Sequence, residues 1–137
     1  MPHKAGCLCG AVRITIDAEP IAARQCWCRL CQYLGGGGPT VNVGFPSDKV
    51  TTSGDIRWHA STADSGNAMQ RGFCPACGTP LFSKAESRPH ILFIRAGALD
   101  DPALIAPQAV IWTDAAPDWA HHDPDLPLYP AQLPPIA

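Results

Sequence analysis

Charged residues are scarce in this sequence of 137 residues, at 16% of the chain, and the formal net charge at pH 7 is only −2. The lack of a basic excess argues against a nucleic-acid-binding surface, because such a surface needs many lysines and arginines for contacts with phosphates. No apolar run is long enough to span a membrane. The N-terminal segment also lacks the apolar core of an export signal, so we expect a cytoplasmic protein with no nucleic-acid or membrane partner.

Residues that break helices are abundant, with 12 glycines and 15 prolines, whereas hydrophobic residues make up an ordinary 46% of the chain. This composition leaves little room for long helices and favours short strands joined by turns. The length suits one modest core, so we expect a single, mainly β domain over residues 1–137. Prolines dominate residues 116–137, and we expect this tail to lie extended on the surface, anchored by Trp119, Leu128 and Tyr129.

Alternation of apolar and polar residues predicts a series of short strands. They are expected at residues 11–16, 40–45, 50–53, 56–60, 68–73, 79–83, 90–95 and 110–113. Residues 21–25 are expected to lead in extended form into the three-cysteine loop. The segment 90–95 is the most apolar and should be central in its sheet. Residues 50–53 and 56–60 flank Gly54-Asp55 and should pair as a hairpin. One short helical turn is expected at 28–33.

Seven cysteines are the unusual feature of the composition. They fall in three tight groups, which are Cys7 and Cys9; Cys26, Cys28 and Cys31; and Cys74 and Cys77. An odd number of cysteines without an export signal is a poor basis for disulfides, and clustered thiols in a reducing compartment are typical of metal ligands. Inert buried cysteines would be scattered singly, and none of these is single.

The segment Cys74-Pro75-Ala76-Cys77-Gly78 is a C-x-x-C-G turn, whose two thiolates converge on one ion. Such a pair fills two positions of a tetrahedral site and needs a second pair. Only Cys7 and Cys9 are free to provide it, so the spacing predicts a closed structural site of four cysteines.

The middle group offers three thiolates within six residues and no fourth cysteine. Three protein ligands with one open position are typical of a catalytic zinc site, and we assign that role to Cys26, Cys28 and Cys31. The alternative is that a histidine closes the site. The candidates are His3, His59, His90, His121 and His122.

Thiolate ligands favour zinc or an iron–sulfur cluster over magnesium or calcium. An iron–sulfur cluster usually draws on a longer local run of cysteines, so we expect two zinc ions per chain. The glycine run 35–38 that follows Cys31 is either a flexible connector or a backbone that approaches the open metal site closely.

The cysteine motifs resemble those of the glutathione-dependent formaldehyde-activating enzyme family, also called the centromere protein V domain. The resemblance spans about residues 5–130 and rests on five segments. These are Gly6-Cys7-Leu8-Cys9-Gly10-Ala11-Val12, Cys26-Trp27-Cys28-Arg29-Leu30-Cys31, Arg71-Gly72-Phe73-Cys74-Pro75-Ala76-Cys77-Gly78-Thr79-Pro80-Leu81, Gly97-Ala98-Leu99-Asp100-Asp101-Pro102 and Ile111-Trp112-Thr113.

The resemblance implies an Mss4-like (β-tent) fold of short antiparallel strands with zinc-binding turns and little helix. It also implies a structural zinc at the four-cysteine site and a catalytic zinc at the three-cysteine site. The family's named activity joins formaldehyde to glutathione to give S-hydroxymethylglutathione, a carbon–sulfur lyase-class reaction. The alternatives are a non-catalytic, zinc-stabilised binding module and a protein that stores metal.

An enzyme of this kind would take a small thiol such as glutathione as its partner, and a second copy of the chain is a further candidate partner. Glutathione is anionic, so cationic side chains near the cysteines should clamp its carboxylates, and the candidates are Arg24, Arg29 and Arg71. Asp48 and His59 are candidates for a general base, on their residue type alone. Family members often have a polar residue where this chain has Trp27, which either lines the open position or packs in the core.

Overall fold

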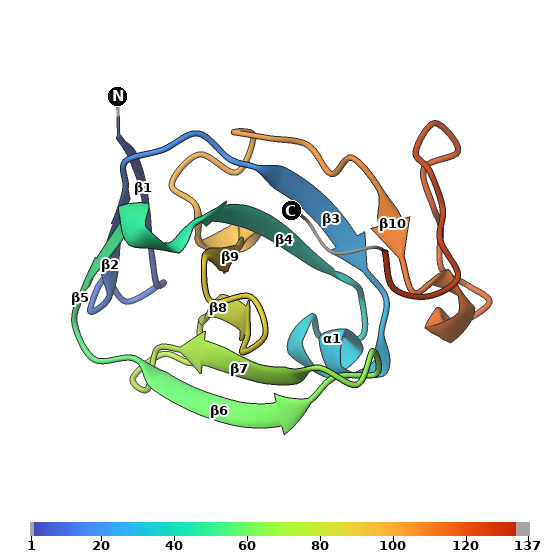
Figure 1. Cartoon of the computed structure of the whole chain (residues 1–137), viewed down its shortest axis with the longest axis horizontal. Helices are drawn as coiled ribbons and strands as arrows, with labels where there is room; N and C mark the ends of the chain where they lie inside the picture. Colours follow the sequence, from blue (N-terminus) through green and yellow to red (C-terminus); the bar gives the residue numbers. More distant parts are fainter. Residues whose placement is uncertain (1, 134–137) are drawn as a thin grey trace.

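The computed structural model describes residues 2–133, which form two β-sheets of short strands joined by turns (Figure 1). The mainly β prediction is therefore confirmed. The strands are β1 (His3–Gly6), β2 (Arg13–Ile16), β3 (Ala22–Cys26), β4 (Thr40–Pro46), β5 (Val50–Ser53), β6 (Arg57–Thr62), β7 (Ala68–Phe73), β8 (Pro80–Ala85), β9 (Ile91–Arg95) and β10 (Val110–Ile111).

Helical structure is confined to short pieces, as the glycine and proline content predicts. They are α1 (Arg29–Leu34) and the 3₁₀ turns η1 (Ser47–Lys49), η2 (Ala96–Ala98) and η3 (Thr113–Ala115). Within residues 2–133, no helix has the length and apolar character needed to cross a membrane. The predicted helical turn at 28–33 is α1, shifted by one residue.

The smaller sheet has the strand order β1-β2-β5, and both pairings are antiparallel. Strand β2 is buried on one face only: Ile14 and Ile16 lie on the buried face, whereas Arg13 and Thr15 lie on the other. This period of two is what a half-buried strand requires. The pairing with β1, which the sequence patterns did not reveal, brings the N-terminus into the sheet.

The larger sheet has the strand order β10-β3-β4-β9-β8-β7-β6. Strand β9 lies in the middle of it, as its apolar sequence predicts, and only the short β10–β3 pairing is parallel. Figure 1 shows the sheet curving from β3 and β4 along one side of the molecule to β7 and β6 along the other, with α1 near their ends. The curvature gives the sheet a concave face.

The predicted hairpin between residues 50–53 and 56–60 is wrong, although both strands exist. Strand β5 pairs with β2 in the small sheet, and β6 pairs with β7 in the large one. Gly54, between them, has a φ of +91° and packs so closely on Ala11 that a Cβ there would overlap its carbonyl oxygen. The Gly54-Asp55 signal therefore marks the passage between two sheets and not a turn within one.

The core lies between the small sheet and the strands of the large sheet. Its largest side chains with almost no exposure include Phe45, Phe82, Leu81, Ile94 and Ile14. Burying each such side chain contributes about 1.5–3 kcal/mol of transfer free energy, which is an upper bound because unfolded chains already bury some surface. Cys7 and Cys74 belong to this same core, so one cysteine cluster is continuous with it.

The proline-rich C-terminal segment contains turns, and its part around Leu128 and Tyr129 runs beside β10. Tyr129 donates from its backbone N–H to the carbonyl of Val110 at 2.9 Å, and Leu128 forms a parallel bridge with Val110. Trp119 is 66% exposed and makes an edge contact with the ring of Trp27, with centroids 6.1 Å apart. The last four residues of the predicted tail lie outside the described residues.

Candidate metal centres and their pocket

The first cysteine cluster joins two distant turns. Cys7 and Cys9 follow β1, Cys74 and Cys77 lie between β7 and β8, and their four Sγ atoms all lie within 4.8 Å of one another. Cys9 Sγ is 3.6 Å from Cys7 Sγ and 3.8 Å from Cys74 Sγ. The structure thus brings together the four residues that ligand counting assigned to one site.

Each of the two turns aims backbone N–H groups at sulfur. The Val12 N–H donates to Cys7 Sγ at 3.2 Å, and the Cys77 N–H donates to Cys74 Sγ at 3.5 Å. A glycine closes each turn in a left-handed conformation, Gly10 at φ +83° and Gly78 at φ +78°. The glycines are needed here because other residues adopt such φ values only with strain.

Thr79 connects the two turns of the four-cysteine cluster. Its Oγ1 accepts a hydrogen bond from the Leu8 N–H at 3.1 Å and lies 3.1 Å from Cys77 Sγ. Hydrogen bonds from the Thr79 hydroxyl and backbone lower the pKa of Cys77 to about 5. Although the Ala11 backbone favours the Cys9 thiolate, the neighbouring Cys7 and Cys77 raise the pKa of Cys9 to about 11.

Four thiols this close cannot all ionise at once without strong mutual repulsion. A divalent cation removes this conflict, because metal binding displaces thiol protons and neutralises several thiolates at once. Four soft donors converging on one point suit zinc, so the residues present fit the predicted ion.

The second cluster lies at the junction of β3 and α1. Cys26 ends β3, Cys28 caps the N-terminus of α1, and Cys31 lies in its first turn. Their Sγ atoms lie within 4.8 Å of one another, and all three side chains are buried. The Cys31 N–H donates to Cys28 Sγ at 3.3 Å, so Cys28 takes the capping role more often filled by Ser or Asp.

Charge is shared unevenly within the three-cysteine cluster as well. Hydrogen bonds with Cys26 and Cys28 lower the pKa of Cys31, and the Thr40 hydroxyl and the Arg95 charge add to this effect. The contacts with Cys28 and Cys31, together with burial, raise the pKa of Cys26 far above its ordinary value. The three buried thiols cannot all ionise unless a cation is bound to them. A soft divalent cation suits such a group of ligands.

No histidine, aspartate or glutamate of residues 2–133 joins the three cysteines in a group of ligand atoms. The two histidines with assigned contacts lie elsewhere. His3 is 3.2 Å from Glu19, and His122 makes an edge contact with the ring of Trp27, with centroids 5.8 Å apart. Trp27 itself is only 3% exposed and packs against Trp119 and His122, away from the pocket lining, which agrees with the core-packing interpretation.

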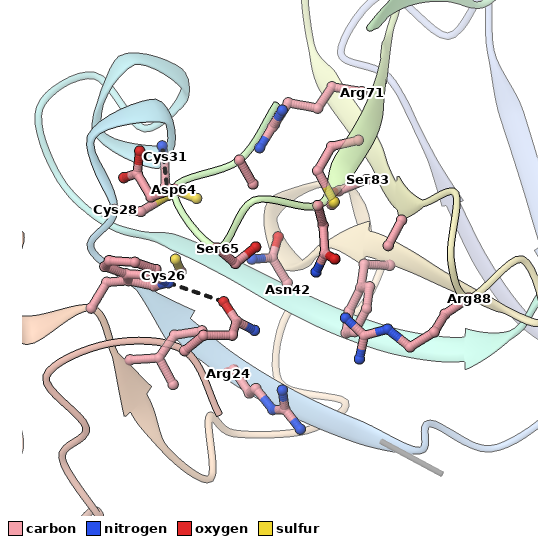
Figure 2. Close-up of a pocket in the computed structure, with 18 of the residues that line it drawn as sticks. Arg24, Cys26, Cys28, Cys31, Asn42, Asp64, Ser65, Arg71, Ser83 and Arg88 are labelled. Atoms are coloured by element: carbon pink, nitrogen blue, oxygen red, sulfur yellow. Dashed lines mark hydrogen bonds between the residues drawn. The ribbon is translucent and has the colours of Figure 1, made fainter. Parts of the chain in front are cut away.

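The three cysteines lie at one end of a pocket on the concave face of the large sheet (Figure 2). Four arginines line the same pocket, with polar side chains between them; the set comprises Arg24, Arg71, Arg88, Arg95, Asn42, Ser83, Ser65, Asn67 and Asp64. Figure 2 shows Arg24, Arg71 and Arg88 spread around the cavity away from the sulfurs. The pocket therefore combines soft ligands with a strong positive field.

The strand register explains why these residues meet. Arg24 lies opposite Asn42, and Asn42 lies opposite Arg95, so the three form one row across β3, β4 and β9. Arg71 lies opposite Ser83 on the neighbouring strand pair. Residues that face each other across paired strands point to the same side of the sheet, which here is the pocket side.

Two of the three arginines that the sequence suggested, Arg24 and Arg71, line the pocket. Arg29 does not line it. Its guanidinium donates to Gln32 Oε1 at 2.6 Å and lies over the Tyr33 ring at 5.0 Å from the centroid. Neither of the general-base candidates, Asp48 in η1 and His59 in β6, lines the pocket, and Asp64 is its one acidic lining residue among the residues described.

Arg88, Arg95 and Asn42 also line the pocket, although they were not among the residues predicted from the sequence. A signal for Arg95 exists in the pattern, because a charged residue ends the most apolar strand on the same face as Phe93. Both of these residues line the pocket. The glycine run, in contrast, does not line the pocket of the three cysteines. It ends α1, with the Gly35 N–H donating to the Cys31 carbonyl at 2.7 Å and the Gly37 N–H donating to Gln32 at 2.8 Å.

Trp112 forms part of the pocket wall in a left-handed backbone conformation, with φ +61°. Such a conformation is unusual for a bulky residue and is held here by neighbouring chain. The Trp112 Nε1–H donates to Gln132 Oε1 at 3.0 Å, and its backbone N–H donates to Ala131 at 3.3 Å. The C-terminal segment thus fixes one wall of the pocket.

The fold and its two thiol clusters define a small β protein with two candidate metal centres, one of which opens into an arginine-lined pocket. The chain belongs to the glutathione-dependent formaldehyde-activating enzyme family, whose model matches residues 2–115. A crystal structure of a protein from Rhodobacter sphaeroides is similar in fold, with a TM-score of 0.56 at 21% identity. That alignment covers 76% of this chain and 91% of the other.

Proposed function

We propose that this protein is a zinc-dependent enzyme that joins a small thiol to an aldehyde, or reverses that step, with glutathione and formaldehyde as the reactants. Membership of the formaldehyde-activating family supports the reaction type. The observation that carries the proposal is the placement of three buried thiols in a pocket that also contains four arginines. A purely structural metal site would need no such pocket.

In this proposal, Cys7, Cys9, Cys74 and Cys77 hold a structural zinc, and Cys26, Cys28 and Cys31 hold a catalytic one. A zinc ion bound by three cysteines would supply a Lewis acid that favours the thiolate form of an incoming thiol. The net reaction is balanced without a further reactant. The thiol sulfur forms a bond to the carbonyl carbon, and the carbonyl oxygen takes up a proton in place of the one that the thiol lost.

The side chains of the pocket bind and orient the anionic thiol. Arg24 and Arg71 are placed to pair with its carboxylates, and a guanidinium can hold a carboxylate through two parallel hydrogen bonds. Arg71 already donates to Ser61 Oγ, which restricts its rotamers and reduces the entropy lost on binding. Clamping the remote end of the thiol places its sulfur toward the cysteines.

Formaldehyde and glutathione also react without a catalyst. The exchange between them can therefore be measured by NMR with and without the protein. We expect the zinc-loaded protein to accelerate the exchange, and Cys28→Ser to abolish the acceleration. Serine preserves the cap of α1 but removes a soft ligand, so the fold remains as a control. Glutathione binding without acceleration would instead support the non-catalytic binding module.

A second arm tests the clamp. Arg71→Met should raise the KM for glutathione but leave the KM for 2-mercaptoethanol, a thiol without carboxylates, unchanged. Arg57→Met removes a charge from the exposed strand β6 and is the matched control.

We also propose that the protein works in the cytoplasm, where seven thiols stay reduced. A homodimer stays a prediction, which sedimentation equilibrium checks.

A further inference from the structure

Arg95 is a buried cation next to the three-cysteine cluster. Its side chain is only 6% exposed, and its Nε has no hydrogen-bond partner among residues 2–133. No carboxylate compensates it, since the two ion pairs of the described chain join His3 to Glu19 and Arg13 to Asp100. A buried charge without a partner costs several kcal/mol, so an anionic ligand in the pocket would reduce this cost.

Arg95 lines the same pocket as Cys26, Cys28 and Cys31. Its guanidinium is fixed there by Asn42, because its NH1 group donates to Asn42 Oδ1. Asn42 is held in turn, since its Nδ2 donates to Thr40 Oγ1 at 3.1 Å. The cation is therefore held in the wall of the pocket that contains the three sulfurs.

We propose that Arg95, held by Asn42 in the pocket wall, makes the three-cysteine centre select an anionic ligand over a neutral one. The role rests on the proposed function only in that the three cysteines hold a divalent metal. Three thiolates around such an ion carry one net negative charge, which would repel an anionic fourth ligand. The Arg95 cation cancels that charge inside a water-poor site, where its effect is little screened.

The other pocket arginines are suited to a different task. Arg24 and Arg88 are partly exposed, and Figure 2 shows them away from the sulfurs. They face the region where the remote end of a ligand would lie. Arg95 differs because it is almost fully buried and is fixed by its hydrogen bond to Asn42. It acts on the charge of the centre, whereas they act on the body of the ligand.

The test uses protein loaded with Co²⁺ and follows the visible absorption bands of the ion as a ligand is added. The anionic probe is 2-mercaptoethanol, which binds as a thiolate and has no carboxylate for the other arginines. The neutral probe is imidazole. We expect Arg95→Met to weaken 2-mercaptoethanol binding at least about tenfold and to leave imidazole binding unchanged or stronger. Arg95→Lys, which keeps the charge, should recover part of the loss.

Two controls isolate the effect. Arg57→Met removes a charge from an exposed strand outside the pocket, and Arg88→Met removes one from the pocket wall. Neither should change the ratio of the two affinities by more than about twofold. Arg95→Gln is a second variant that keeps a hydrogen-bond donor toward Asn42 in case Arg95→Met does not fold.

Equal losses for both probes would overturn the proposal, because they would mean that Arg95 only supports the structure. Unchanged 2-mercaptoethanol binding in Arg95→Met or Arg95→Gln would overturn it as well. These readouts do not depend on turnover. If the protein fails to accelerate the formaldehyde reaction but shows the expected affinity ratio, the proposed function fails and the role of Arg95 stands.

Discussion

The side-chain amide of Gln32 donates a hydrogen bond to the backbone carbonyl of Ala115 at 2.9 Å, across 83 positions of the chain. The same Nε2 also donates to the Trp27 carbonyl at 2.8 Å. Gln32 is buried on α1, so this one amide ties the three-cysteine loop to the turn η3 that follows β10. It helps to hold the backbone around the three cysteines in place, although it does not line the pocket itself.

Replacing Gln32 with leucine keeps the volume and leaves one buried and one partly buried carbonyl group without their donor. We expect Gln32→Leu to lower the free energy of unfolding by about 2–4 kcal/mol, measured by urea denaturation. Gln70→Leu is the matched control, because Gln70 makes only a long, exposed contact of 3.4 Å with Glu86. A change below about 0.5 kcal/mol is expected there. Similar losses in both variants would contradict the role assigned to Gln32.

Thr79 provides a prediction about pH. Its hydrogen bonds lower the pKa of Cys77 to about 5. A group with a depressed pKa binds metal well above that pKa and loses it as the pH falls through it, because protons then compete for the sulfur. In Thr79→Val the Cys77 pKa rises, so metal should leave at a higher pH than in the wild type. Thr79→Ser should behave like the wild type.

Zinc release measured with a colorimetric chelator across a pH series checks this. Thr113→Val serves as a control, since its hydroxyl bonds to the Tyr129 carbonyl at 3.2 Å, far along the chain from the four-cysteine cluster. A release midpoint in Thr79→Val that equals the wild type, or lies below it, would contradict the prediction.

Local chemistry made the two cysteine clusters predictable. The C-x-x-C-G turn around Cys74 and Cys77 carries its own geometry, and counting thiols then paired it with Cys7 and Cys9. Strand β9 was predictable too, because its apolar sequence is what a central strand requires. Each of these inferences needed only a short stretch of chain.

The pocket was not predictable in the same way, because it depends on the register of distant strands. Asn42 meets Arg95 only because β4 pairs with β9 in one particular alignment. Proximity in sequence suggested Arg29 instead, which is next to Cys28 but points to Gln32 and Tyr33. Likewise, the Gly54-Asp55 pair looks locally like a turn, and tertiary contact with Ala11 gives it another role.

Gly54 gives a prediction about stability. Alanine there would combine an unfavourable positive φ with overlap of the Ala11 carbonyl oxygen, so the chain between β5 and β6 would have to move. We expect Gly54→Ala to reduce the free energy of unfolding by about 2–4 kcal/mol in thermal or urea denaturation. Gly97→Ala is the control, because a Cβ at Gly97 meets nothing within 4 Å. It should be neutral or stabilise by up to about 1 kcal/mol.

The two cysteine clusters should respond differently when they lose a ligand. Cys74 is fully buried in the main core, and its cluster joins the turn after β1 to the turn before β8. Cys28 belongs to a separate, smaller cluster beside α1. We therefore expect Cys74→Ser to abolish cooperative unfolding, because metal binding at this site contributes directly to folding. Cys28→Ser should keep a cooperative transition and lose one equivalent of zinc.

Circular dichroism melting together with elemental analysis of zinc separates these outcomes, since one reports on the fold and the other on each site. Chelation of the wild type should proceed in two steps, with the zinc of the three-cysteine cluster leaving first and the fold persisting until the second zinc leaves. This order follows from the connections of each site: one holds a single β–α junction, and the other holds two parts of the chain more than 60 residues apart. A cooperative melt in Cys74→Ser, or collapse of the fold in Cys28→Ser, would reverse the assignment of the structural and the catalytic centre.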